Sequence, residues 1–456
     1  MKDGNLKSFL KADTLATPSG RIVRVLSERG SLSAAQIARL TGLARSTVST
    51  AVAELRQSGL ISEAEVASTP GSKSVGRPGT ALTLNPEAGT CIGVHLALDE
   101  LRVAIADVSH SVIAEQKITL PKDYGPAVAA RKLKDWIQHT YAENGLRLSG
   151  LLGVGVSVSA PVAPDGTVHR SSIVPTWAGV NVVKVFSAAL GATVLADNES
   201  NCSAIAEMMW GAAAGHDNFV LFKMNVGVGG SFVVNGHIVR GIAGGTGEFG
   251  HVSLDPEGEL CRCGNRGCLE LKAGFRAPLN EVSRAQGRDL TIEEVVELAL
   301  EGDACAMRMI GDVAEVAGRG LAMIGTGLNP PLILVCGALA QSGPVLMEPL
   351  RAAFEKHTLL KSRDLPSEQR TRIITGALLR NDVVLGAIGL VLRHHGRAGE
   401  RGDDGQSRQG CPRGQPGALC GSSPHTRRGV QCRQTVGAGA GHTGSRMDRD
   451  ASRGGP

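Results

Sequence analysis

Two successive rounds of strand-like and helix-like segments occupy residues 90–395. The first round begins with β-rich segments in "TCIGVHLALDELRVAIADV" and "SVIAEQKITL", followed by the helical segment "PAVAARKLKDWIQHTYAENG". It continues through the apolar strands "LLGVGVSVSAPV" and "GATVLADN" to a small-residue helix, "ESNCSAIAEMMWGAAAG". The second round contains "NFVLFKMNVGVGGSFVVNGHIV", a helical region from Thr291 to Leu328, the strand "LILVCGAL" and terminal helices. Strand groups that alternate with helices twice predict an α/β protein of two similar lobes with a cleft between them.

The length and composition set outer limits on the class of protein. A chain of 456 residues with 42% hydrophobic residues has room for two or three domains, and its 3% of aromatic residues predict a mainly aliphatic core. No apolar stretch is long enough for a signal peptide or a membrane-spanning helix. We therefore expect a cytoplasmic, nucleoid-associated protein with no membrane partner.

The net charge of +5 is unevenly distributed. Residues 1–84 carry 11 Lys/Arg against 6 Asp/Glu, and residues 396–456 carry 10 against 5, so the intervening part of the chain is acidic. A basic N-terminal segment on an acidic body favours a separate polyanion-binding module. A solvated charged surface is the alternative explanation for so modest an excess, so charge alone does not decide between them.

Residues 1–84 carry the pattern of a winged helix-turn-helix domain. Amphipathic helical segments are expected in residues 19–30, 33–42 and 45–60, each followed or interrupted by a glycine stop. The second and third are separated only by the short turn "TGLA", which is typical of a helix-turn-helix. The segment "LISEAEVASTPGSKSVGRPGTALTL" then predicts two strands around a Gly/Pro/Ser-rich loop, which would form the wing.

In such a domain the third helix enters the major groove of DNA. The side chains that this helix would offer to bases and phosphates are Arg45, Ser46, Thr47, Ser49 and Thr50. Arg77 lies in the wing loop, from which it could reach the neighbouring minor groove. Small helical bundles without any role in DNA binding are common, but helices, turn and basic wing together favour a DNA-binding domain.

The last 61 residues, 396–456, differ from the rest of the chain in composition. They contain 15 glycines and 10 arginines and show no hydrophobic periodicity. Such a segment cannot bury enough apolar surface to offset the entropy of ordering it, so we expect a disordered tail.

The segment "CRCGNRGC" predicts a metal site. Its cysteines, Cys261, Cys263 and Cys268, come from one tight glycine-containing loop, and His251 lies ten residues upstream of the first. Three thiolates and one imidazole form the tetrahedral Cys3His set that a structural Zn²⁺ prefers. A site with four protein ligands has no position for an activated water, which disfavours hydrolysis. An iron–sulfur centre, or free thiols beside a core histidine, are the competing interpretations.

The wider pattern "GEFGH…CRCGNRGCLE" closely resembles the signature of the ROK family, whose members are sugar kinases or sugar-responsive repressors such as the xylose repressors. The resemblance extends from about residue 20 to residue 395 and includes the wing phrase "GRPGTALTLNP". It implies a two-lobed, actin-like (ribonuclease H-like) ATPase-type fold in residues 85–395, and zinc bound at the Cys3His set. The N-terminal DNA-binding segment indicates the repressor branch.

The resemblance also implies which residues would hold a sugar. They are Asn198, Glu199, Glu248, His251 and Glu270. Carboxylates accept pairs of hydrogen bonds from neighbouring hydroxyls, and an imidazole bound to zinc through one nitrogen has the other fixed as a donor. For any single glutamate taken alone, a charge on an exposed loop is the better explanation.

Three positions depart from the pattern of the family's kinases. The stretch "HLALD", residues 95–99, stands where the kinases have Asp-x-Gly-Gly-Thr, so that side chains fill the phosphate space and a carboxylate is added to it. Glu199 stands where the catalytic base is an aspartate, and Val226 where a threonine is usual. We therefore expect no enzymatic activity.

Together these features predict a repressor of carbohydrate-utilisation genes that binds operator DNA as a homodimer or higher even oligomer. The effector would be a monosaccharide or a derivative, and zinc would be structural. One alternative is an active ROK sugar kinase, phosphorylating hexoses with ATP, with an appended DNA-binding domain. Another is a regulator that responds to a partner protein and no longer to a sugar.

Overall fold

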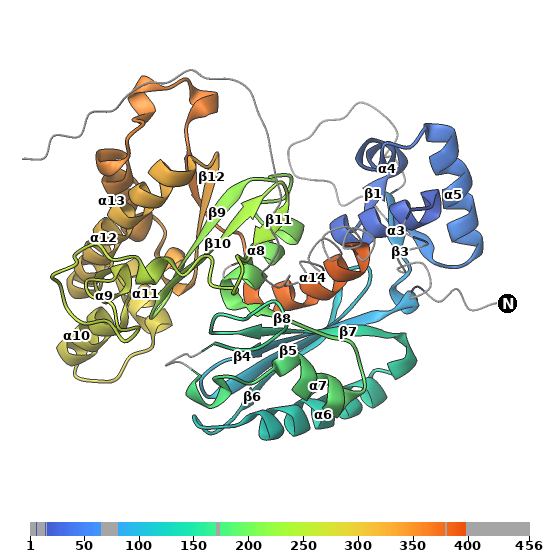
Figure 1. Cartoon of the computed structure of the whole chain (residues 1–456), viewed down its shortest axis with the longest axis horizontal. Helices are drawn as coiled ribbons and strands as arrows, with labels where there is room; N and C mark the ends of the chain where they lie inside the picture. The colour runs from blue at the N-terminus through green and yellow to red at the C-terminus, as the bar shows by residue number, and fades with distance from the viewer. Residues whose placement is uncertain are drawn as a thin grey trace, which may run out of the picture. The chain divides into compact units, whose positions relative to one another are not determined.

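The computed structural model describes residues 16–64, 81–169, 174–378 and 381–397, together with Leu6 and Thr14. Within these residues, one sheet of three strands belongs to the N-terminal segment, and two sheets of five strands each form the cores of two lobes (Figure 1). The described residues up to Arg397 belong to one compact unit. Arg77, and all but the first two residues of the tail expected at 396–456, lie outside the described residues.

The N-terminal segment has the elements of a winged helix. Its helices are α3 (Pro18–Arg29), α4 (Ala34–Thr41) and α5 (Arg45–Gln57), and its strands are β1 (Leu32–Ser33), β2 (Ile61–Ala64) and β3 (Ala81–Leu84). Ser33 and Gln36 form a capping box that starts α4, and Gly42 ends that helix in the left-handed conformation. Because β2 and β3 pair antiparallel in one sheet, the expected wing strands are confirmed.

Lobe 1 is built on the sheet β6-β5-β4-β7-β8. Its strands are β4 (Thr90–Leu96), β5 (Glu100–Asp107), β6 (Val112–Thr119), β7 (Leu151–Val158) and β8 (Val194–Asn198), and its helices are α6 (Pro126–Glu143) and α7 (Val182–Leu190). The first three strands form an antiparallel meander, and β7 then pairs in parallel with β4. This arrangement brings the C-terminal ends of β7 and β8 to the same edge of the sheet, where both lead into the cleft described below.

Lobe 2 is built on the sheet β11-β10-β9-β12-β13. Its strands are β9 (Phe219–Met224), β10 (Val228–Val234), β11 (His237–Val239), β12 (Leu332–Cys336) and β13 (Arg372–Thr375). Its helices are α9 (Leu269–Ala273), α10 (Arg276–Gln286), α11 (Ile292–Leu300), α12 (Ala304–Leu328) and α13 (Pro344–His357). The helical region expected over 291–328 is two helices, because Asp303 caps a new helix by accepting from the amide of Ala306.

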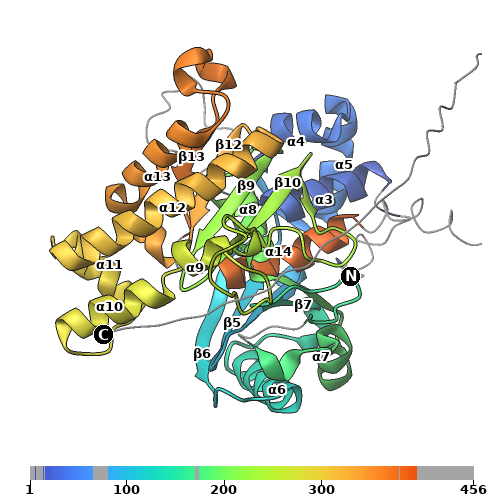
Figure 2. The same ribbon diagram turned by 60° about the vertical axis from the view of Figure 1, so that its left-hand side comes forward.

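Two long helices lie between the sheets of the two lobes (Figures 1 and 2): α8 (Glu199–Trp210) and α14 (Asp382–Arg397). They run in the same direction, since Gly386 of α14 packs against Cys202 and Gly389, further along, packs against Met209. A side chain on Gly386 would overlap the carbonyl of Cys202, so this close approach requires glycine. Gly93 and Gly155 allow α14 to lie equally close to β4 and β7.

Within the described residues, no helix combines the length and apolar character needed to cross a bilayer.

Candidate functional site

A cleft of about 920 Å³ opens between the two lobes. All five residues expected to hold a sugar line it: Asn198, Glu199, Glu248, His251 and Glu270. They come from the start of α8 and from the segment 248–270, which are far apart in the sequence. The structure therefore brings these side chains together around one cavity, although their role as sugar ligands stays a prediction.

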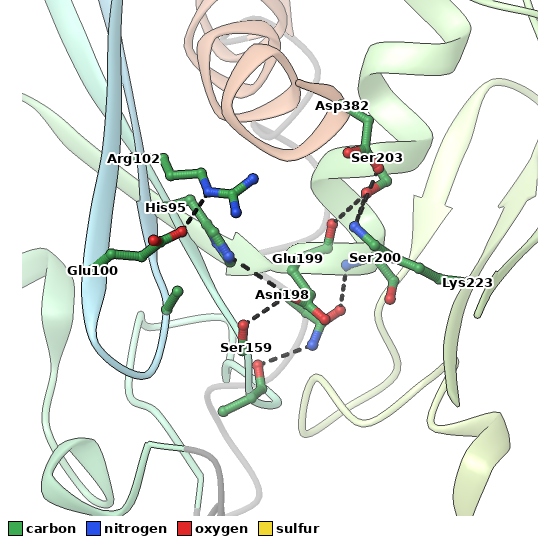
Figure 3. Close-up of polar contacts among 12 residues, drawn as sticks. His95, Glu100, Arg102, Ser159, Asn198, Glu199, Ser200, Ser203, Lys223 and Asp382 are labelled. Carbon is green, nitrogen blue, oxygen red and sulfur yellow. Dashed lines mark hydrogen bonds and ion pairs between the residues drawn. The ribbon is translucent and has the colours of Figure 1, made fainter. Parts of the chain in front are cut away.

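Asn198 and Glu199 are held at the point where β8 turns into α8. The side-chain oxygen of Asn198 accepts from the amide of Ser200 at 2.8 Å and so caps the helix, while its amide group donates to the carbonyl of Ala160 at 3.0 Å. The carboxylate of Glu199 accepts from the hydroxyl of Ser159 at 2.7 Å (Figure 3). Both side chains are fixed in place by the protein before any ligand arrives.

Glu248 is the most perturbed acid of the cleft. Burial, followed by repulsion from Glu199 and Glu270, raises the pKa of Glu248 to about 7, and Arg262 opposes the shift only weakly. Glu270 differs because its two oxygens are already engaged, one by Arg262 at 2.7 Å and the other by the backbone amide of Val228 at 3.1 Å. Near neutral pH, Glu248 can therefore donate or accept a hydrogen bond, whereas Glu270 accepts.

Sequence reasoning missed an ammonium group in the floor of the cleft. Lys223 on β9 is almost fully buried, and its Nζ donates to Asp382 at 3.1 Å and to Ser203 at 2.8 Å (Figure 3). Burial by itself would lower the pKa of Lys223, but Asp382 and Glu199 outweigh it and hold the pKa above its ordinary value. The available sequence signal was the single charged residue in the apolar segment "FVLFKM". A lysine in a buried strand indicates an acidic partner, because lysines are almost never fully buried unless paired.

Other cleft residues that the sequence reasoning missed are Ser159 and Arg262. Arg262 lies between two of the expected metal ligands, and this position in the loop was the available signal. By contrast, none of residues 95–99 contributes to the lining of the cleft.

The four expected metal ligands, His251, Cys261, Cys263 and Cys268, form one cluster in which all donor atoms lie within 4.8 Å of one another. Nδ1 of His251 is 3.6 Å from the sulfur of Cys261, and the sulfurs of Cys263 and Cys268 are 3.6 Å apart. Bond lengths of about 2.3 Å to sulfur and about 2.0 Å to nitrogen in a tetrahedral zinc site require donor separations of about 3.5–3.8 Å. The donor set and these two separations fit a zinc ion.

The loop that carries the cysteines is shaped by backbone turns. Gly264 and Gly267 both have positive φ, and a side chain on Gly267 would overlap the carbonyl of Asp255. Burial and the neighbouring thiols raise the pKa of Cys268 to about 12. A divalent metal bound here would supply the positive charge that stabilises the thiolate form of these closely spaced sulfurs.

The predicted DNA-contacting residues that are described lie together on α5. Arg45, Ser46, Ser49 and Thr50 are exposed and Thr47 is half-buried, whereas Val48 and Leu55 of the same helix are buried in the core of the domain. The helix thus presents a polar, basic face away from its packing face. Arg77 lies outside the described residues.

Comparison with protein families finds two matches. A model described as the ROK family matches residues 91–394, and a model described as the MarR family matches residues 15–68. The first covers most of the two lobes, and the second covers the helices and the first wing strand of the N-terminal segment.

Relatives with assigned names match along most of this chain. The xylose repressor of Bacillus spizizenii is 26% identical over 376 residues, which are 82% of this chain and 94% of that protein. The DNA-binding transcriptional repressor Mlc of Escherichia coli is 25% identical over 81% of this chain and 93% of its own length. A glucokinase of Halalkalibacterium halodurans is 26% identical, but over 60% of this chain and 87% of the enzyme.

Among solved structures, too, a regulator matches more of this chain than a glucokinase does. A ROK family transcriptional regulator, titled as a homologue of E. coli Mlc, matches with a TM-score of 0.66 at 22% identity and covers 84% of this chain and 96% of its own. A ROK family glucokinase from Streptomyces griseus, solved with glucose and AMPPNP, matches with a TM-score of 0.57 at 24% identity over 66% of this chain and 99% of its own. The predicted fold, two actin-like lobes preceded by a winged helix, is confirmed.

The raised pKa of Glu248 predicts a pH dependence of stability. Because its pKa rises from 4.5 to about 7 on folding, the native state favours the protonated acid, and its contribution is complete below pH 4.5 and lost as the pH rises through about 7. Wild type should therefore lose stability relative to Glu248→Gln between pH 5 and pH 8. Urea unfolding of both proteins across this range measures the difference, with Glu281→Gln as a control on the exposed surface of α10. Parallel pH profiles for wild type and Glu248→Gln would show that Glu248 titrates normally.

Proposed function

The chain belongs to the ROK family, and we propose that it is a DNA-binding transcriptional regulator that represses carbohydrate-utilisation genes until a sugar releases it. The observation that carries this proposal is the set of five polar side chains gathered around one cleft, in a chain that begins with a MarR-type domain. The names of the xylose repressor and Mlc, which match along most of their lengths, support it.

In the proposed DNA complex, α5 is the recognition helix. Its exposed Arg45 and Ser49 would meet base edges and phosphates, since these side chains donate to the acceptors of both. The wing, with Arg77, would lie along the neighbouring groove. We propose a homodimer or higher even oligomer, because two recognition helices related by twofold symmetry match a palindromic operator. Such a protein acts in the compartment that holds the DNA.

In the proposed sugar complex, the ligand lies between the lobes and accepts and donates hydrogen bonds at both. Asn198 and Glu199 offer groups from the start of α8, while Glu248 and Glu270 offer them from lobe 2. A ligand that contacts both lobes favours the closed arrangement of the lobes by its differential affinity for it. Closure would alter the spacing of the two recognition helices, so that they no longer fit the operator.

We propose that the cluster of His251 and the three cysteines holds a structural zinc ion. Zinc bound there would supply no reaction chemistry, because its four positions are filled by the protein. It would hold the loop 261–268 against the end of the 3₁₀ turn that carries His251. The free nitrogen of that imidazole would then be fixed as a donor toward the sugar.

We propose that the chain is not a kinase. The stretch "HLALD" at residues 95–99 supports it, since side chains stand where the family's kinases have two glycines. Glu199 and Val226 support it too, because they stand where an aspartate and a threonine are usual. The alternative is an active sugar kinase, which the match to the glucokinase favours.

Two variants should separate the two binding activities. Arg45→Ala should weaken binding to a DNA fragment selected from a random pool by about tenfold or more, since such contacts contribute about 1–3 kcal/mol, while leaving sugar binding unchanged. Glu248→Ala should keep operator affinity and lose release by sugar. Fluorescence anisotropy of labelled DNA measures operator binding and its release by D-xylose, D-glucose or N-acetyl-D-glucosamine. Thermal shifts with the same three sugars measure sugar binding. Release that survives in Glu248→Ala would place the sugar elsewhere, and the absence of any thermal shift would favour control by a partner protein.

Wild-type protein should show no sugar-dependent ATP hydrolysis. A coupled assay for ADP with the same three sugars tests this, with a ROK glucokinase as the positive control. Turnover in the ordinary range of enzymes, about 1 s⁻¹ or faster, would instead establish the kinase alternative.

Zinc should be present at one ion per chain in protein purified without chelator. Cys263→Ser should lower this content and the midpoint of thermal unfolding, because the folded loop depends on the metal. Cys305→Ser is the matched control, since Cys305 is half-buried at the start of α12 and is not part of the cluster. Elemental analysis together with calorimetry measures both quantities. Iron in place of zinc, or equal metal content in the two variants, would contradict this site.

A further inference from the structure

The two helices between the lobes both begin at the cleft. α8 starts with Glu199, capped by Asn198, and both residues line the cleft. α14 starts with Asp382, whose carboxylate accepts from Nζ of Lys223, another lining residue. The same ammonium donates to Ser203 of α8 (Figure 3), so one buried cation joins the cleft ends of both helices.

Toward their other ends, the same two helices reach one residue of the N-terminal domain. Trp210, the last residue of α8, donates from Nε1 to Nδ1 of His110 at 2.9 Å, and Nε2 of His110 lies 2.8 Å from the carbonyl oxygen of Ser27 on α3. The hydroxyl of the same Ser27 donates to the carbonyl of Leu392 on α14 at 3.2 Å. Ser27 is buried and therefore has contacts with both helices, directly with one and through His110 with the other.

The imidazole of His110 is held in one protonation state and one orientation. An indole N–H can only donate, so Nδ1 must accept from Trp210, and Nε2 carries the proton that goes to the carbonyl of Ser27. Burial holds the pKa of His110 below its ordinary value, although the bond to Ser27 and the charge of Asp107 oppose the shift. His110 has φ of 78°, and Gly30 at the end of α3 packs against its ring. The ring thus has little freedom to move without moving α3.

The two helices differ in their contacts with the two lobes. α8 is hydrogen-bonded to both lobes, since Asn201 accepts from the hydroxyl of Ser231 on β10 at 2.7 Å and donates to Asp197 on β8 at 2.7 Å. α14 is pressed onto the sheet of lobe 1 through Gly93 and Gly155, which allow backbone contact. A change in the angle between the lobes therefore acts on α8 through its contacts with lobe 2. Both helices connect to α3, α8 through His110 and α14 through Leu392.

We propose that the Trp210–His110–Ser27 hydrogen-bond chain, together with the Ser27–Leu392 contact, transmits the state of the sugar cleft to the DNA-binding helices. This inference rests on the proposed function, and it specifies how that function is regulated. α3 packs against both α4 and α5, so a displacement of α3 reaches the recognition helix. Trp210 and His110 are positioning residues here, since neither lines the cleft nor belongs to the DNA-binding face.

Three variants of the full-length protein test the connection. Trp210→Phe removes the indole donor and keeps an aromatic ring. His110→Asn keeps an acceptor near the position of Nδ1, tolerates the positive φ and cannot reach the carbonyl of Ser27. The double variant combines them, and Trp136→Phe on α6 of lobe 1 makes the same chemical change at a buried tryptophan outside the hydrogen-bond chain.

The quantity measured is the ratio of operator Kd with and without saturating sugar, using whichever of D-xylose, D-glucose and N-acetyl-D-glucosamine releases the wild type. Each single variant should reduce this ratio by about three- to tenfold, while sugar Kd and sugar-free operator Kd each stay within about twofold of wild type. The double variant should lose no more than either single variant, because both substitutions interrupt one chain. Trp136→Phe should keep the wild-type ratio.

A merely structural contact would give a different result. If both single variants bind sugar and operator normally and keep the wild-type ratio, or if the losses add in the double variant, the proposed transmission is wrong while the regulatory function stands. If wild type binds DNA but none of the three sugars releases it, the proposed function and the transmission fail together for these sugars. Circular dichroism melting curves identify any variant whose DNA binding is lost through unfolding. If one single variant is unfolded, the ratio measured for the other single variant tests the transmission.

Discussion

The close contact between α8 and α14 is the constraint on which the rest of the arrangement depends. Gly386 lets the backbone of one helix touch that of the other, and Gly155 does the same between α14 and the sheet of lobe 1. Backbone-to-backbone packing leaves no compressible side-chain layer, so a displacement of one of these elements is passed on to the element it touches. The cleft lies at one end of this pair of helices and α3 lies near the other. The helix pair therefore connects the cleft with the N-terminal domain.

The electrostatics of the cleft follow from this packing. Three carboxylates, those of Glu199, Glu248 and Glu270, share a partly buried space with Lys223 and Arg262. Each cation is already paired, Lys223 with Asp382 and Arg262 with Glu270. Burial, and then repulsion from Glu199 and Glu270, therefore raise the pKa of Glu248. A cavity with surplus acceptors and one titrating acid suits a neutral, hydroxyl-rich ligand better than a phosphorylated or carboxylated one, which would add charge of the same sign.

The sequence predicted the two-lobed α/β fold, the winged helix and the residues of the metal cluster, because each has a local signal. Periodicity marks the strands and helices, and cysteine spacing marks the cluster. It did not reveal β13, a four-residue strand with one buried side chain, or the break at Asp303 that divides one expected helix into α11 and α12. The strand β13 is too short to show a periodic pattern, and the apolar pattern of the helical region continues across Asp303 without a visible break.

Contacts between distant segments were the larger omission. Lys223 and Asp382 are 159 positions apart, and the two bonds of His110 join it to residues 83 and 100 positions away. No periodicity or spacing rule relates such residues, since their partnership depends on the final packing of three elements around them. The lone lysine in an apolar strand did indicate that a partner must exist, but only the fold identifies Asp382 as that partner.

The same fold can serve catalysis or sensing, and the difference lies in what its interlobe helices are bonded to. In a sensor, ligand binding changes the output only by the difference in ligand affinity between the two states of the output domain. Rigid helices that end in solvent would let the lobes close without cost to α3, and the DNA-binding domain would not respond. Here the last residue of α8 is bonded through His110 to Ser27, and Leu392 of α14 accepts directly from it. A closure that displaces α8 or α14 therefore either moves α3 or breaks these hydrogen bonds, and by linkage either one makes the affinity for a ligand depend on the position of α3.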